Sequence, residues 1–184
     1  MNVAPTAPPD ADTLSRVWDA LDQLTDPEIP VITLREMGIL RDVRAATDGL
    51  EVVITPTYSG CPAMGQIEDD VRAVVLGLGL PARVVTQLAP AWTTDWMTDA
   101  AKDKLRAYGI APPQGRCAGD TASQPDATNV LRFVRGAAEA TPVVPCPHCG
   151  SSHTVERSHF GSTACKALYK CLDCQEPFDY FKPY

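Results

Sequence analysis

Two short cysteine pairs near the C-terminus limit what this chain can fold into more than any other feature. In each pair two residues separate the cysteines, and 21 residues separate the pairs. Each Cys-x2-Cys turn presents two sulfurs on one side, and two facing turns complete a tetrahedral four-sulfur site that suits Zn²⁺. We therefore expect a zinc ribbon over residues 142–184, with four ligands: Cys146, Cys149, Cys171 and Cys174.

The ribbon interpretation carries further expectations and alternatives. Gly150, after the first pair, fits the left-handed conformation that such a turn needs. A rubredoxin-type or 4Fe–4S iron site would use the same four ligands, and four unrelated buried thiols would bind nothing. A module of about 40 residues has too small a core to be stable alone, so metal binding is expected to supply its folding free energy. All four coordination positions are filled, which indicates a structural site.

Charge and hydropathy exclude several classes of partner. The 184-residue chain has a net charge of −7, and residues 1–110 carry 9 Lys/Arg against 16 Asp/Glu. Residues 142–184 carry four of each and no basic run, so we expect no nucleic-acid partner. No apolar run of about 18 residues indicates a membrane span. The first residues lack the features of a secretory signal. A cytoplasmic protein is expected, in which the seven cysteines do not form disulfides.

The residues before the ribbon predict a compact α+β domain over 12–110. Apolar residues at helical spacing predict three helices, at 13–24, 62–78 and 94–109, with Asp12 or Thr13 as the first N-cap. Apolar or alternating runs predict three strands, at 39–45, 50–56 and 82–88, the first two joined as a β-hairpin at Asp48-Gly49. The order α-β-β-α-β-α predicts helices packed on a three-stranded sheet.

Residues 111–141 are rich in Pro, Gly, Ser, Thr and Ala and are expected to form a linker. Cys117 lies in this segment and is interpreted as a surface thiol without a role. Cys165, six residues before the second cysteine pair, has two interpretations. It is either a small buried residue or an auxiliary thiol with a redox or metal-transfer role.

Cys61 occupies the turn between a predicted strand and a predicted helix. A thiol at a helix N-terminus is expected to have a lowered pKa, which suits a nucleophile or a metal ligand. All three histidines lie in the last 40 residues, so this domain lacks the base that a cysteine nucleophile requires. Asp26 and Glu28 would repel a thiolate unless a cation lay between them. We interpret Cys61, Asp26 and Glu28 as a candidate metal or cluster site. The alternative is that Cys61 only caps a helix, and that Pro27 and Pro30 only stiffen the loop that carries Asp26 and Glu28.

These motifs resemble the iron–sulfur assembly factors related to SufT and to the eukaryotic cytosolic Fe–S targeting protein. The shared residues are Asp26-Pro27-Glu28, Met37-Gly38-Ile39, Thr55, Thr57 and Gly60-Cys61-Pro62. Together with CPHCGS, FGSTACKALYKC and CQEPFDYFK, they resemble the PaaD family, the small subunits encoded with the phenylacetyl-CoA ring 1,2-epoxidase. The resemblance spans residues 13–110 and 142–184.

The resemblance implies an accessory role in phenylacetate catabolism. The epoxidase uses a di-iron oxygenase subunit and a flavin/Fe–S reductase, and both are implied as partners. This chain shows neither a Glu-x-x-His pair on a helix nor a dinucleotide-binding fingerprint, so we expect no catalytic role of its own. The implied function is delivery of an Fe–S cluster or iron to a partner, with Cys61 as a transient ligand assisted by Asp26, Glu28 and Thr57. Two copies could share one cluster in a homodimer. The rival interpretation is a scaffold that bridges oxygenase and reductase.

Overall fold

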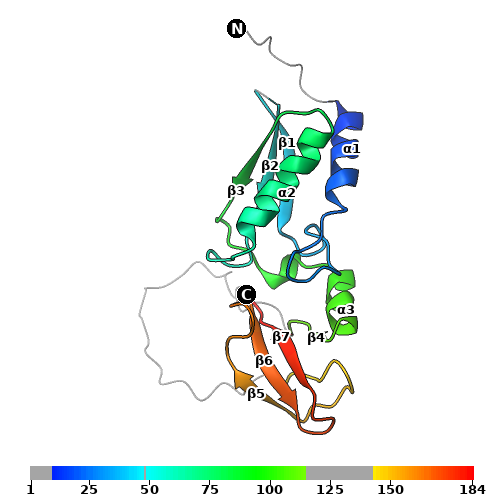
Figure 1. Ribbon diagram of the computed structural model, residues 1–184, viewed down its shortest axis with the longest axis vertical. Helices are drawn as coiled ribbons and strands as arrows, with labels where there is room; N and C mark the ends of the chain where they lie inside the picture. The colour runs from blue at the N-terminus through cyan, green and yellow to red at the C-terminus, as the bar shows by residue number, and fades with distance from the viewer. Residues whose placement is uncertain (1–9, 48, 115–142) are drawn as a thin grey trace, which may run out of the picture.

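The computed structural model describes residues 10–47, 49–114 and 143–184. Cys117 and most of the predicted linker lie outside the described residues. The first sheet has the strand order β1-β2-β3 (Figure 1). β1 (Leu40–Ala46) and β2 (Gly49–Ile54) are antiparallel and form the predicted hairpin. β3 (Ala82–Thr86) pairs with β2 in parallel, which requires the helical crossover that α2 provides.

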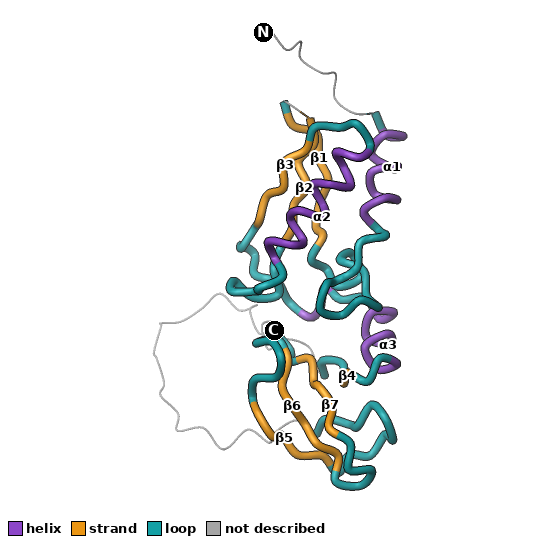
Figure 2. The backbone as a smooth tube through the Cα atoms, in the orientation of Figure 1, coloured by secondary structure: helices purple, strands orange, loops and turns teal. Residues whose placement is uncertain are grey.

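Two helices pack beside this sheet, with α2 lying across its face (Figures 1 and 2). α1 (Ala11–Leu21) begins earlier than predicted because the N-cap is Asp10, whose Oδ1 accepts a hydrogen bond from the Thr13 N–H at 2.8 Å. The predicted caps Asp12 and Thr13 are therefore wrong. α2 (Met64–Gly77) begins two residues later than predicted. Cys61 therefore lies in a turn before the helix.

The third predicted helix is two separate elements. The 3-10 turn η1 (Thr94–Trp96) is followed by an extended Met97, and α3 (Asp99–Ala107) begins after it. The break occurs because Thr98 caps a new helix, with its hydroxyl accepting the Ala101 N–H at 3.1 Å. α3 lies at the end of the domain beside the second sheet (Figure 1). None of the described helices has the length and hydropathy that crossing a membrane requires.

The second sheet contains the ribbon. β5 (Thr154–Ser158), β6 (Lys166–Cys171) and β7 (Pro177–Phe181) are consecutive antiparallel neighbours. A fourth strand, β4 (Ile110–Ala111), follows α3 and pairs with β7 in parallel. The chain thus contributes a strand to the ribbon's sheet before the ribbon itself begins.

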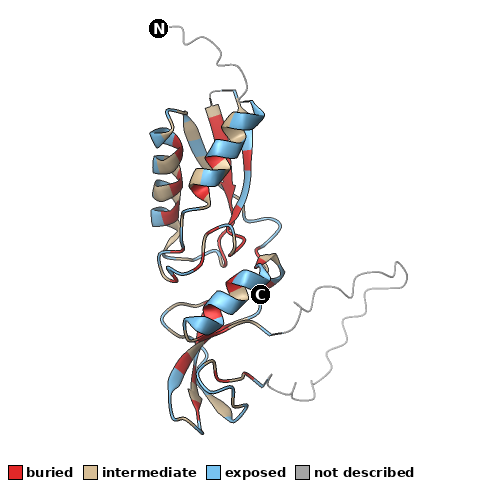
Figure 3. Cartoon of the chain, turned by 90° about the vertical axis from the view of Figure 1, so that its right-hand side faces the viewer, coloured by how far each residue is buried: buried red, intermediate tan, exposed pale blue. Residues whose placement is uncertain are grey.

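Of two buried clusters among the described residues, one joins the two parts of the chain. Figure 3 marks buried residues in red in both parts. Phe181 and Cys165 of the ribbon belong to the same buried cluster as residues of the first domain. Trp92, only 4% exposed, lies at this junction, with its ring centroid 6.0 Å from that of Phe181 and 6.3 Å from that of Tyr184. Its Nε1–H donates to the Met37 carbonyl at 3.1 Å, which anchors the junction to the first domain.

Candidate functional site

The two cysteine pairs converge in the ribbon. The sulfurs of Cys146, Cys149, Cys171 and Cys174 all lie within 4.8 Å of one another, with Cys146 and Cys174 3.7 Å apart and Cys149 and Cys171 3.6 Å apart. Zn–S bonds of about 2.3 Å would place tetrahedral sulfurs about 3.8 Å from one another. The spacing therefore fits a four-coordinate metal ion.

The two cysteine turns have the same backbone geometry. The N–H of Cys146 donates to the Ser151 carbonyl at 2.9 Å, and the N–H of Cys171 donates to the Glu176 carbonyl at 3.0 Å. Gly150 has φ 76°, the left-handed conformation expected of it, and Gln175 has φ 67° at the equivalent position of the second turn. Sequence reasoning missed Gln175, because a residue with a side chain rarely adopts this conformation.

A polar cluster fixes the two turns relative to each other. Asp173, inside the second turn, accepts a hydrogen bond from the Ser151 hydroxyl and lies 3.1 Å from Nδ1 of His153. Both contacts lower the pKa of Asp173. The backbone N–H of Cys174 lowers the pKa of Cys171 to about 7. Against the Glu176 N–H, burial and the neighbouring sulfurs raise the pKa of Cys174 to about 12, because thiols this close do not all ionise without a cation between them. No sequence signal marks Ser151, Asp173 or His153 for this role.

The second candidate site is the loop between β2 and α2, where Cys61 is partly exposed. The Cys61 N–H donates to the Tyr58 carbonyl at 3.1 Å, and the Cys61 carbonyl accepts from the Met64 N–H at 3.4 Å. These bonds make a tight turn before the helix. The thiol is therefore held by the turn and is not part of the first helical turn.

The predicted lowering of the Cys61 pKa is wrong. Burial raises the pKa of Cys61, the Ala63 N–H lowers it, and the charges of Asp26 and Glu28 raise it further. The main physical reason is that the thiol is partly buried, and a second is that α2 begins only at Met64. The thiol meets one backbone N–H instead of the open end of a helix, while two carboxylates face it.

The two carboxylates contribute differently. Asp26 is 8% exposed, and its Oδ1 accepts hydrogen bonds from the N–H groups of Glu28 (2.8 Å) and Ile29 (2.9 Å). It therefore holds the shape of its loop. Glu28 is partly exposed and is the more accessible carboxylate beside Cys61.

The structure brings Cys165 to the same place. Cys165 lies in the loop between β5 and β6 and is 6% exposed, and the Thr163 Oγ1 is 2.9 Å from its sulfur. Burial raises the pKa of Cys165, and the charge of Glu28 adds to this effect. Cys165 in turn raises the pKa of Cys61. A thiol from the ribbon thus shares the electrostatic environment of the Cys61 loop.

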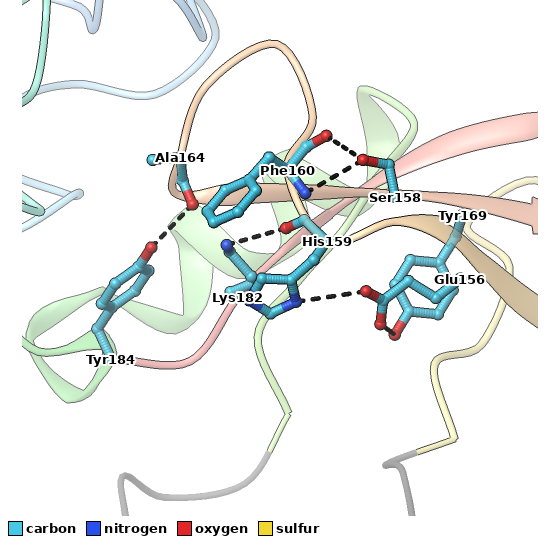
Figure 4. A network of polar contacts seen from close by, with 8 residues as sticks. All are labelled: Glu156, Ser158, His159, Phe160, Ala164, Tyr169, Lys182 and Tyr184. Carbon is cyan, nitrogen blue, oxygen red and sulfur yellow. Dashed lines mark hydrogen bonds and ion pairs between the residues drawn. The ribbon is translucent and has the colours of Figure 1, made fainter.

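The last residues of the chain hold the Cys165 loop in position (Figure 4). The Tyr184 hydroxyl donates to the Ala164 carbonyl at 2.9 Å, and the Lys182 N–H donates to the Cys165 carbonyl at 2.9 Å. The carbonyl of Tyr184 accepts from the Thr94 N–H at 3.1 Å. The loop is therefore tied both to β7 and to the first domain.

A cavity of about 260 Å³ adjoins the Cys61 loop and is lined by Thr55, Thr57, Tyr58, Trp92 and Tyr184, among others. Thr57, a candidate from the resemblance, is 8% exposed. Thr55 is 1% exposed, and its hydroxyl has no hydrogen-bond partner among the described residues. A buried hydroxyl left unpaired costs about 1–3 kcal/mol, so it needs an explanation.

Comparisons with known proteins cover both parts of the chain. A family model described as an iron-sulfur cluster assembly protein matches residues 14–87, and the PaaD zinc beta ribbon domain matches residues 132–182. An Escherichia coli (strain K12) protein that carries the name of a 1,2-phenylacetyl-CoA epoxidase subunit is 45% identical over 181 residues, which cover 98% of this chain and 97% of that protein. The Bacillus subtilis (strain 168) "Fe-S protein maturation auxiliary factor YitW" is 31% identical over 93 residues, covering 50% of this chain and 84% of that protein.

Solved structures include similar chains. A domain of unknown function from Bacillus anthracis is 27% identical with a TM-score of 0.45, covering 50% of this chain and 89% of that one. Rv1466 from Mycobacterium tuberculosis is 30% identical with a TM-score of 0.31, covering 58% of this chain and 94% of that one.

The assignment to a family follows from the sequence matches. The Escherichia coli relative aligns over almost the whole of both proteins. The two family models match the two parts of the chain in the order in which they occur. The chain belongs to the PaaD family of phenylacetyl-CoA epoxidase subunits, in which an iron–sulfur cluster assembly domain precedes a zinc ribbon.

Proposed function

We propose that this chain is an accessory subunit that matures an Fe–S cluster or iron centre in its epoxidase partners. Three findings support the proposal. The Escherichia coli relative is named as a subunit of the epoxidase, the first family model is described as an iron–sulfur cluster assembly protein, and the Bacillus subtilis relative is named as a maturation factor. Membership of a multisubunit system implies the other subunits as partners. The oxygenase and the reductase are the proposed recipients, in the cytoplasm.

The observation that carries the proposal is a partly exposed thiol in the assembly domain, separate from the four-sulfur group. Cys61 is proposed as the transient ligand. With its raised pKa it is a neutral thiol near pH 7, and binding a cation releases its proton. The negative charges of Asp26 and Glu28 oppose the bare thiolate but attract the metal cation. Loss of the cargo restores the proton, which favours release.

The other proposed residues have supporting roles. The four ribbon cysteines are proposed to hold Zn²⁺, which supplies folding free energy and takes no part in transfer. Thr57 is proposed to line the cargo site from the adjoining cavity. A homodimer that presents two Cys61 thiols to one cluster is the proposed form for larger cargo.

The test removes the Cys61 thiol and measures the partners. Cys61→Ser and the control Cys117→Ser are each co-expressed with the oxygenase and reductase in a strain that lacks the native chain. The partners are purified anaerobically, and their iron and acid-labile sulfide are measured. We expect Cys61→Ser to retain its zinc but to leave the partners with the metal content found when the chain is absent.

Full loading of the partners with Cys61→Ser would contradict the carrier function. If the partners also failed to associate without the chain, the bridging scaffold would replace it. Normal loading with Cys117→Ser is required, because that variant also removes one thiol outside the ribbon group.

A further inference from the structure

We infer that the cargo site is built across both parts of the chain, with Cys61 and Cys165 as its two sulfur ligands. The inference rests on the proposed function for the nature of the cargo, an iron ion or an Fe–S cluster. It gives a function to the contact between the ribbon and the first domain, because the ribbon supplies the second sulfur ligand of the site.

The first support is the contact between the two loops that carry these thiols. Tyr58, three residues before Cys61, packs against the buried cluster that contains Cys165. The Tyr58 hydroxyl also forms a hydrogen bond with the backbone of Ala164, the residue before Cys165. Ala164 is held a second time by the Tyr184 hydroxyl at 2.9 Å. Tyr58 thus connects the Cys61 loop to Ala164, and Tyr184 fixes the same residue to the end of the chain.

The second support is a shared electrostatic environment. Cys165 and Glu28 both act on the Cys61 thiol, and Glu28 also acts on Cys165. Burial raises the pKa of Tyr58, and the charges of Cys61, Cys165 and Glu28 raise it further. Two thiols near a carboxylate form a donor set of the kind that this cargo takes, since soft sulfur ligands suit iron and Fe–S clusters.

The third support is independent of the thiols. The unpaired Thr55 hydroxyl is 1% exposed and lines a cavity whose walls include Tyr58 and Tyr184, the residues that hold the two loops together. A buried donor without an acceptor is explained if a ligand supplies the acceptor. Sulfide in an Fe–S cluster accepts such hydrogen bonds, which also tune its potential.

The donor set also suits temporary binding. Among the described residues, the four ribbon cysteines form the group of three or more potential ligands that lies within 4.8 Å, and Cys61 and Cys165 belong to no such group. Two sulfurs leave other coordination positions to be filled by a partner or a second copy. A partner that completes the coordination can therefore take the cargo.

The experiment uses the full-length, zinc-loaded chain under anaerobic conditions. Wild type, Cys61→Ser, Cys165→Ser and the control Cys117→Ser are treated with Fe²⁺ and sulfide, desalted, and assayed for iron, sulfide and zinc per chain. We expect wild type and Cys117→Ser to retain iron and sulfide. Each of the other two variants should fall to the background level while keeping its zinc and its melting temperature.

The outcomes separate this inference from the proposed function. Retention of the cluster by Cys165→Ser, with loss in Cys61→Ser, would overturn the two-thiol site and leave the carrier function intact. Absence of uptake by wild type would also overturn it, and the partner-loading experiment would then decide the carrier function alone.

A second measurement needs no variant and remains informative if Cys165→Ser fails to fold. Phenylarsine oxide reacts with two adjacent thiols, forming two As–S bonds and releasing one water. After treatment of the zinc-loaded wild type, we expect peptide mass spectrometry to find Cys61 and Cys165 joined through one arsenic. Adducts that never contain both residues would contradict the inference.

Discussion

Cys61 is the residue on which the proposed chemistry depends, and its neighbours in space determine its protonation. Burial raises its pKa, the Ala63 N–H lowers it, and the charges of Asp26 and Glu28 raise it further. A thiol with a raised pKa is mostly protonated at neutral pH and reacts slowly with electrophiles, because the thiolate is the nucleophile. In the proposed function, such a thiol would stay protected until a metal binds.

Glu28→Gln should make Cys61 more reactive. Removing one negative charge lowers the thiol pKa and raises the thiolate fraction at pH 7, so we expect alkylation of Cys61 about two- to fivefold faster than in wild type. In wild type the rate should be low at pH 7 and rise as pH increases toward the raised pKa. The measurement is time-resolved mass spectrometry of the alkylated, zinc-loaded protein.

Asp69→Asn is the matched control for this measurement, because it removes a carboxylate from a side chain on α2 that is 75% exposed. Its rate should equal that of wild type. Fast labelling of wild-type Cys61 at pH 7 would mean that the pKa is lowered after all.

At the scale of elements, the junction depends on close approaches between short segments. The loop before β1 passes so near to η1 that a side chain at Gly38 would place its Cβ 2.7 Å from Cβ of Trp96. Gly38 also has φ 77°, which favours glycine. Gly79, after α2, has the same φ but no atom within 4 Å of such a Cβ. Comparing alanine substitutions at Gly38 and Gly79 therefore separates the cost of backbone strain from the cost of a steric clash.

Gly38→Ala should destabilise the protein more than Gly79→Ala does. Gly79→Ala carries the cost of a left-handed alanine, about 1–2 kcal/mol. Gly38→Ala adds an overpacking cost of about 1–3 kcal/mol, since the backbone of η1 has to move. Denaturant unfolding of both variants measures the difference in their free energies of unfolding. Equal losses of stability would show that η1 can move away from the new side chain at no cost.

At the scale of the whole molecule, the ribbon and the first domain share structure. β4 joins the ribbon's sheet from the end of α3, and Phe181 lies in the core of the first domain. A metal ion bound by the four ribbon cysteines would therefore contribute to the stability of the first domain as well. This coupling would keep Cys165 in place beside Cys61.

Removal of the metal should destabilise the first domain. All three tryptophans, Trp18, Trp92 and Trp96, precede the ribbon, so tryptophan fluorescence reports on that part of the chain and, through Trp92, on its junction with the ribbon. After treatment with a chelator we expect its thermal midpoint to fall by several degrees, because each kcal/mol shifts the midpoint by about 2–4 °C for a protein of this size. Restoring Zn²⁺ should reverse the change. An unchanged midpoint would show that the two parts fold independently.

The sequence by itself determined features that depend on residues close together in the chain. Cys-x2-Cys spacing indicated the four-sulfur group, and the run before and after Asp48-Gly49 predicted the hairpin of β1 and β2. Helical periodicity predicted α1 and α2, with errors of one to three residues at their ends. The division into residues 12–110 and 142–184 stays a prediction.

Only the tertiary structure decided how distant segments meet. Cys165 acts electrostatically on Cys61, and β4 pairs with β7, although no local pattern links these segments. The buried Thr55 hydroxyl has no hydrogen-bond partner within the described part of the chain, which no local pattern shows either. The direction of the Cys61 pKa shift was also decided only by the tertiary structure. A pKa depends on every charge and buried surface near the group in space, whereas a sequence shows only the neighbours along the chain.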